Sequence, residues 1–181
     1  MTPEVVRAMA RYNRWMNEKV FASAALLGDE ECKRDRGAFF KSIHGTLNHL
    51  LVADRIWLGR LHGVVPPAGF LAAGIRALDQ ELFADFTELR AERQHTDQAI
   101  DAWATTVTPS SFEETLRFVA VGRQREHPLW WVVMQLFNHQ THHRGQITTL
   151  LLQAGQDPGS TDLLAMLFEE EKAAVEAAAA H

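Results

Sequence analysis

Cysteine is nearly absent from this 181-residue chain, which contains only Cys32. A single cysteine cannot form an internal disulfide, so the disulfide-stabilised secreted class is excluded and a reducing compartment is favoured. We expect Cys32 to be a free thiol in the loop after the first helix. Hydrophobic residues make up 46% of the chain and charged residues 23%, an ordinary globular balance that can bury a core without disulfide bonds. The length predicts one domain spanning residues 1–181.

Long apolar runs are also missing. The most apolar helical stretch, Leu129 to Phe137, is interrupted by Gln135 and is far shorter than the roughly 20 residues that span a bilayer. The first four residues, Met1 to Glu4, contain no basic region followed by an apolar one, so we expect no signal peptide. These observations predict a soluble cytoplasmic protein with no membrane partner.

Positive charge is in deficit, because the formal net charge is −5. A broad attraction for nucleic acid or an anionic membrane is therefore not expected, and no nucleic-acid recognition motif is present. A small molecule is the expected partner.

Apolar residues recur every three or four positions along most of the chain, which is typical of amphipathic helices. The segment from Val64 to Leu71 contains Pro66, Pro67 and Gly69 and is predicted to be a loop. Four long helices with short connections favour an all-α four-helix bundle with a short C-terminal helix. The expected helices cover residues 2–27, 37–61, 78–107, 128–154 and 162–179.

A short region before the last long helix has a different pattern. Residues 112–126 include the alternating stretches Leu116 to Phe118 and Val119 to Val121, with Gly122 after them. This pattern predicts a small two-stranded hairpin.

Residues 137–146, FNHQTHHRGQ, carry most of the functional information. His139 and His143 are four residues apart, so on a helix both imidazoles point the same way and can bind one ion. Gln140 stands where the helical zinc motif His-Glu-x-x-His has its glutamate, so the general base of a metalloprotease is missing. The two histidines share a helix face with apolar residues that we expect in the core: Val132, Leu136, Ile147 and Leu150.

Two imidazoles in an apolar core need partners, because an unpaired buried polar group costs roughly 1–3 kcal/mol. A metal ion satisfies both, and His49 on the helix predicted over residues 37–61 is the expected third ligand. Three protein ligands with one open position are common in catalytic zinc sites. Imidazole also suits nickel, iron and copper, so this ligand set does not select the metal.

Several alternatives remain open from the residues alone. A histidine pair at this spacing is also compatible with a surface or core role, and His142 could replace His143 as a ligand. Asp54, on a mostly apolar face, is predicted either to hydrogen-bond a ligand histidine or to form a buried ion pair with Arg55 or Arg60. The polar residues around the ligands favour a solvated pocket, although they could also form the outward face of the helix: Asn138, Gln140, Thr141, Arg144 and Gln146. Arg144 and Gln146 are also candidate contacts to the substrate or to a ligand.

Three segments together resemble the DinB superfamily of DinB/YfiT-like metalloenzymes. They are YNRWMN at 12–17, LNHLLVADRIWL at 47–58 and FNHQTHHRGQ at 137–146, with weaker similarity in GQDP at 155–158 and TDL at 161–163. The resemblance spans most of the chain and implies a four-helix bundle that binds one divalent metal, zinc or nickel. The ligands of the family fall on His49, His139 and His143. Homodimers are also implied.

The resemblance further implies a metal-dependent enzyme, because characterised relatives include transferases and isomerases that use low-molecular-weight thiols such as bacillithiol or mycothiol. We therefore expect a metal-dependent transferase or hydrolase, with a thiol-dependent S-transferase as the specific hypothesis. The alternative is a non-catalytic, metal-stabilised protein that binds a small molecule or acts in a stress response. Nothing in the sequence identifies a catalytic acid or base.

Overall fold

The computed structural model describes residues 1–120 and 122–179, most of which are helical. Val121 of the expected hairpin, together with Ala180 and His181, lies outside the described residues. No helix in the described ranges is long and apolar enough to cross a membrane. The elements are α1 (Pro3–Ala25), α2 (Asp29–Lys33), α3 (Ile43–Leu61), α4 (Phe86–Thr106), a 3-10 helix (Pro109–Glu113), β1 (Thr115–Ala120), β2 (Arg123–Pro128), α5 (Leu129–Gln153) and α6 (Leu163–Ala179).

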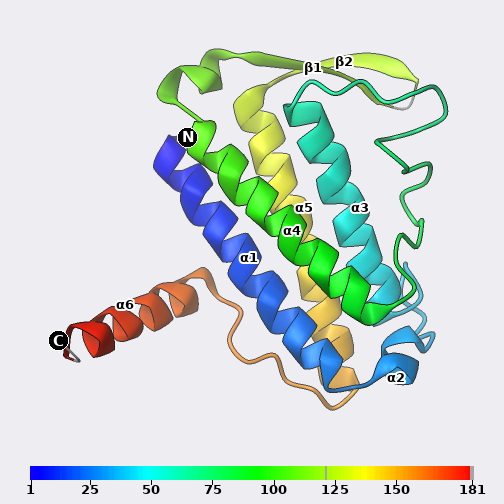
Figure 1. The fold of residues 1–181 in the computed structure, drawn as a ribbon, viewed down its shortest axis with the longest axis vertical. Coiled ribbons are helices and arrows are strands. Elements are labelled where there is room, and N and C mark those ends of the chain that lie inside the picture. The colour runs from blue at the N-terminus through cyan, green and yellow to red at the C-terminus, as the bar shows by residue number, and fades with distance from the viewer. Residues whose placement is uncertain (121, 180–181) are drawn as a thin grey trace.

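The predicted all-α bundle is confirmed. Its four long helices form a closed ring, in which α1 packs against α4 and α5, and α3 packs against the same two helices (Figure 1). The apolar face predicted for the last long helix is buried in this bundle, with Val132, Leu136, Ile147 and Leu150 all at most 8% exposed.

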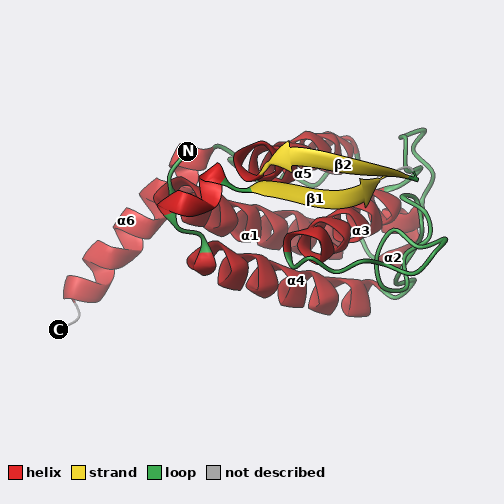
Figure 2. Cartoon of the chain, turned by 90° about the horizontal axis from the view of Figure 1, so that it is seen from above, coloured by secondary structure: helices red, strands yellow, loops and turns green. Residues whose placement is uncertain are grey.

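The small hairpin lies across one end of the bundle, over α3 and α5 (Figures 1 and 2). Strands β1 and β2 are antiparallel, with Thr115 opposite Pro128. Gly122 in the turn has a φ of 68°, a conformation that glycine adopts at no steric cost. Strand β2 ends at Pro128, so the hairpin extends two residues beyond the predicted region.

Helix α6 extends away from the bundle (Figures 1 and 2). Two hydrogen bonds join it and the preceding segment to α1: the Tyr12 hydroxyl donates to the Thr161 carbonyl at 2.6 Å, and the Trp15 indole donates to the Glu169 carboxylate at 2.8 Å. Met166 is the buried residue of this helix.

Two predicted helix starts were too early. Helix α3 begins at Ile43 instead of residue 37, because Lys41 has a φ of 66° and Ser42 caps the helix by accepting the Gly45 N–H at 3.0 Å. Helix α4 begins at Phe86 instead of residue 78, because the Asp85 carboxylate accepts the Glu88 N–H at 2.8 Å. The loop after α3 is consequently longer than predicted.

Helix α2 was not predicted, and it changes the surroundings of the single cysteine. Cys32 lies in this short helix and not in a loop, and its side chain is buried. The thiol donates to the Ala24 carbonyl of α1 at 3.0 Å. Cys32 is therefore a packing residue whose pKa is raised by burial.

The two larger apolar clusters of the core lie in opposite halves of the bundle, and a third, smaller one packs Val52 and Ile56 of α3 against Ala72 and Ile75 of the following loop. One of the larger clusters includes Leu47 and Ile147, and the other includes Ile100 and Leu136. Buried polar residues lie between the two clusters on each long helix: Asn13 and Asn17, Asp54, Arg93 and Asp97, and Gln140 and Arg144.

Candidate metal centre

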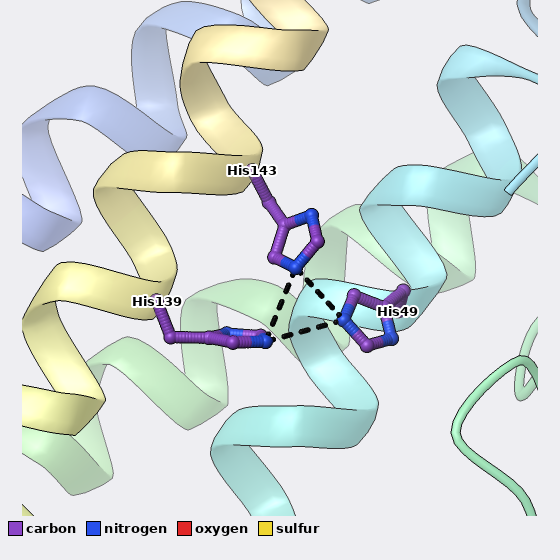
Figure 3. Close-up of side chains that lie close together, drawn as sticks. All are labelled: His49, His139 and His143. Carbon is purple, nitrogen blue, oxygen red and sulfur yellow. Dashed lines mark hydrogen bonds between the residues drawn. The ribbon is translucent and has the colours of Figure 1, made fainter. Parts of the chain in front are cut away.

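The structure brings the three predicted histidines together between α3 and α5 (Figure 3). His49 Nε2 lies 3.3 Å from His139 Nε2 and 3.2 Å from His143 Nε2. The remaining pair, His139 Nε2 and His143 Nε2, is 3.1 Å apart. Three ring nitrogens from two helices therefore point at one common centre.

The outer nitrogens of two rings fix which nitrogen carries the proton. His49 Nδ1 is 2.7 Å from the Leu78 carbonyl, and His143 Nδ1 is 2.8 Å from Gln146 Oε1. Both oxygens can only accept, so each Nδ1 must be protonated and each Nε2 of the neutral ring carries a lone pair. The central contacts of these two rings therefore bring lone pairs together, which is unfavourable without a positive centre between them.

The spacing of the three nitrogens fits a single metal ion. Two nitrogens bound at about 2.05 Å to one tetrahedral ion lie about 3.3 Å apart. The three observed separations lie between 3.1 and 3.3 Å. His49, His139 and His143 could therefore hold one metal ion between them.

The electrostatics of the site favour the form of histidine that binds metal. Burial lowers the pKa of His139 to about 3 and that of His143 to about 4, and it also lowers the pKa of His49. The other histidines of the cluster lower the pKa of His139 further. All three rings are therefore neutral at neutral pH, and neutral imidazole is the ligating form.

Two residues outside the histidine triad hold its rings in place. The Phe40 ring stacks on His49 at a centroid distance of 3.8 Å and meets the edge of His143 at 5.6 Å. Gln146, besides accepting from His143, places its amide nitrogen 3.3 Å from Nε2 of the exposed His142. His142 thus lies outside the histidine cluster. Of the two candidate contact residues, Arg144 and Gln146, it is Gln146 that contacts a predicted ligand.

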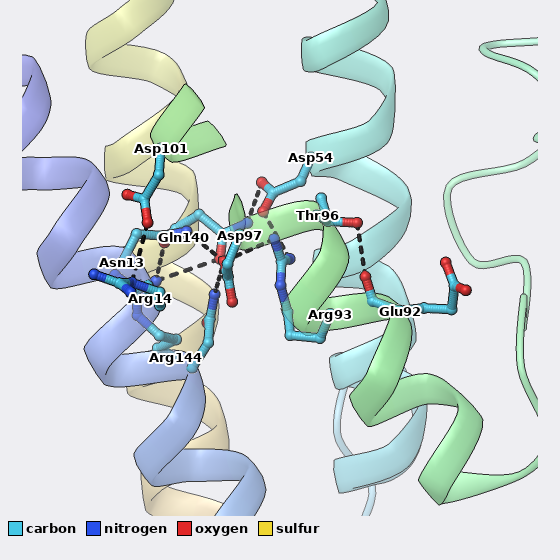
Figure 4. Close-up of polar contacts among 11 residues, drawn as sticks. Asn13, Arg14, Asp54, Glu92, Arg93, Thr96, Asp97, Asp101, Gln140 and Arg144 are labelled. Carbon is cyan, nitrogen blue, oxygen red and sulfur yellow. Dashed lines mark hydrogen bonds and ion pairs between the residues drawn. The ribbon is translucent and has the colours of Figure 1, made fainter. Parts of the chain in front are cut away.

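The prediction that Gln140 and Arg144 line a solvated pocket was wrong. Gln140 is 0% exposed and Arg144 is 2% exposed. Each follows a predicted ligand by one residue, which turns it about 100° around the helix and into the bundle interior. They belong to the polar layer between the two apolar clusters (Figure 4).

Asp54 is an acceptor in the same polar layer. Its carboxylate forms a buried ion pair with Arg93 of α4 at 2.7 Å and accepts a hydrogen bond from Gln140. The expectation of a buried ion pair was thus right in kind, but neither Arg55 nor Arg60 is the partner. Arg55 instead pairs with Glu92.

The remaining members of the polar layer were missed in the sequence. Arg93 also pairs with Asp97 at 2.9 Å, and Asp97 accepts hydrogen bonds from Asn17 at 2.8 Å and Asn13 at 3.2 Å. Arg144 donates to Asn13. The available signal was Arg93 on the apolar face of its predicted helix, where an isolated charge requires a buried partner.

The comparisons with known proteins agree with this architecture. No solved structure matches the chain. The chain is 24% identical over 171 residues to the protein named Protein DinB of Bacillus subtilis (strain 168), with 87% of this chain and 90% of that protein covered. The sequence model of the family described as DinB family matches residues 1–174, which is nearly the whole chain. The chain therefore belongs to the DinB family.

Proposed function

We propose that the chain is a metal-dependent enzyme that binds one divalent ion, zinc or nickel, through His49, His139 and His143. The observation that carries this proposal is the convergence of three Nε2 atoms within 3.3 Å of one another. Within residues 1–120 and 122–179, no fourth His, Cys, Asp or Glu joins the cluster. This supports a coordination position left for a substrate, as in catalytic sites with three protein ligands.

The proposed substrate for that position is a low-molecular-weight thiol, such as bacillithiol or mycothiol. A divalent ion held by these three neutral ligands would keep its full charge and would lower the pKa of a thiol bound to it, which favours the nucleophilic thiolate at neutral pH. The chain's own contribution is to keep the histidine rings neutral and fixed. Burial keeps the rings neutral, whereas the Leu78 carbonyl and the Gln146 amide oxygen orient two of them by accepting hydrogen bonds from the ring Nδ1–H groups.

The proposed reaction is an S-transfer. The thiolate sulfur forms a bond to an electrophilic carbon of the second substrate, while the bond to the leaving group breaks and that group departs with the electron pair. The proton lost by the thiol passes to solvent. The residue that assists the leaving group is not assigned.

A cobalt-substituted sample tests the proposal, because cobalt absorption reports on the ligands of the ion. Added cysteine or glutathione should shift the visible spectrum, and a transfer assay with an aryl chloride should consume thiol with the wild type and not with His139→Gln. A spectrum that ignores every thiol, combined with no transfer, would refute the enzyme proposal. The metal-stabilised, non-catalytic protein would then be the better account.

A further inference from the structure

Arg60, in the last turn of α3, is a half-buried cation with no acidic partner within residues 1–120 and 122–179. Its guanidinium lies 4.5 Å from the centre of the Trp57 ring and 4.7 Å from that of Phe118 in β1. The two rings are 5.6 Å apart with planes at 75°, so they form two walls of a corner around the guanidinium. These contacts hold the cation but satisfy none of its N–H donors with an oxygen acceptor.

Nearby arginines show what Arg60 lacks. Arg55 pairs with Glu92, and Arg117 pairs with Glu126 at 2.9 Å. Among the residues that the structure describes, the Arg60 side chain has neither an ion-pair partner nor a hydrogen-bond partner. Burial lowers the pKa of Arg60 with no neighbouring carboxylate to oppose it, and the side chain still remains charged at neutral pH.

The Arg60 side chain borders two adjoining hollows on the outer side of α3. Their volumes are about 300 and about 350 Å³, and both are lined by Arg60, Val64, Pro66 and Leu71. The first continues toward the hairpin along Phe118, and the second continues along Ile56 of α3. The guanidinium thus lies where two largely apolar spaces meet.

We propose that these hollows bind a small monocarboxylate with an apolar body, with its carboxylate on Arg60. A guanidinium presents paired N–H donors that match both oxygens of a carboxylate, and the apolar walls accept the rest of the molecule. The other two cations of the lining, Arg55 and Arg117, are already neutralised by Glu92 and Glu126. One net positive charge suits a monoanion, whereas a phosphate dianion would face the carboxylate of Glu126.

The proposed site is separate from the histidine centre. Arg60 follows His49 by eleven residues on α3, which places it about 16 Å further along the helix axis. A packed apolar cluster of Val52, Ile56, Ala72 and Ile75 occupies the face between them. Carboxylate binding should therefore not require the metal, and the proposal stands independently of the proposed S-transfer.

Calorimetric titration with octanoate and with its neutral analogue octanamide tests this site. Octanoate should bind the wild type about tenfold more tightly than octanamide, because a charge-assisted hydrogen bond is stronger than a neutral one. Arg60→Met should lose about this factor for octanoate alone, and Arg60→Lys should lie between the two. Prior treatment with a chelator should leave octanoate binding unchanged.

Arg76→Met is the matched control. Arg76 lies over the Phe70 ring at 4.5 Å but lines neither hollow, so its loss should leave octanoate binding unaltered. Equal affinity for octanoate and octanamide, or unchanged octanoate binding in both Arg60 variants, would overturn the proposal. Inorganic phosphate that binds more tightly than octanoate and depends on Arg60 would overturn the assignment to carboxylates.

Discussion

The side-chain amide of Gln140 donates a hydrogen bond to the carboxylate of Asp54, and so joins α5 to α3 beside the histidine centre. Both residues are 0% exposed. Gln140 directly follows His139, and Asp54 lies five residues after His49 on the same helix. A polar contact inside the bundle thus sets the relative position of the two helices that carry the histidines.

The first prediction concerns the ion pairs of this polar layer. Arg93→Met leaves Asp54 and Asp97 buried without their cation, and removal of one partner of a buried pair costs about 3–5 kcal/mol. Urea unfolding should show a loss of that size in the free energy of unfolding. The control is Arg55→Met, which breaks the partly exposed pair with Glu92 and should cost less than about 1 kcal/mol. Similar losses in the two variants would contradict a stabilising polar layer.

The polar layer also shows where sequence reasoning reached its limit. The faces of His139 and His143 followed from four-residue spacing, because the neighbouring apolar residues mark the buried side of α5. The same reasoning put Gln140 and Arg144 toward solvent, because a polar side chain normally faces water. Their burial depends on Asp54, Arg93 and Asn13 of three other helices, and no pattern within one helix predicts such partners.

The second prediction concerns Gln146, which accepts a hydrogen bond from His143 Nδ1 at 2.8 Å. Gln146→Leu removes the acceptor that fixes the ring and its proton, so metal affinity should fall about 10- to 100-fold. Competition with a chelating dye measures this change. His142→Ala, which removes the other partner of Gln146, should leave the affinity within about twofold of the wild type, since His142 lies outside the centre. Equal affinities of Gln146→Leu and the wild type would exclude this role.

The third prediction compares two glycines of α3. A Cβ at Gly45 would lie 2.2 Å from the Phe40 carbonyl oxygen, whereas a Cβ at Gly59 would meet nothing within 4 Å. Gly45→Ala must therefore displace the backbone of Phe40, whose ring stacks on His49, and it should destabilise the protein by about 1–3 kcal/mol and weaken metal binding. Gly59→Ala should stabilise by about 0.5–1 kcal/mol and leave metal binding unchanged. Thermal unfolding and competition with a chelating dye measure stability and metal affinity in both variants. A Gly45→Ala protein as stable as the wild type, with the same metal affinity, would contradict the packing described.

The fourth prediction concerns pH and the metal-free protein. The pKa of His139 falls from 6.5 to about 3 and that of His143 from 6.5 to about 4 on burial. Between the folded pKa values and pH 6.5, the unfolded chain binds more protons than the folded chain, and protonation therefore favours unfolding. Above pH 6.5 both states are neutral at these residues, so the free energy of unfolding that their burial contributes is fully present. It is lost as the pH falls toward the folded values.

Urea unfolding of chelator-treated protein between pH 7 and pH 5 measures this loss. The double variant His139→Asn/His143→Asn should lose less stability over the same range, because its two asparagines do not titrate. Identical pH dependence in the two proteins would show that these histidines do not couple folding to protonation.

Helix boundaries near the site were predicted less well than helix faces. The apolar periodicity before Ile43 and before Phe86 continues past the true starts, so it predicted helices that were too long. Lys41 with its positive φ and the cap at Asp85 end the helical geometry there. The longer loop that results brings the Leu78 carbonyl to His49, a contact made by backbone and therefore invisible in the pattern of side chains.

The metal content of purified protein tests the central claim most directly. Elemental analysis of the wild type should give close to one first-row divalent ion per chain. His49→Ala, His139→Ala and His143→Ala should each lose most of it, because each removes one of three Nε2 ligands, while His142→Ala should retain it. Wild-type protein without metal after loading, or metal retained in His49→Ala but lost in His142→Ala, would contradict the account.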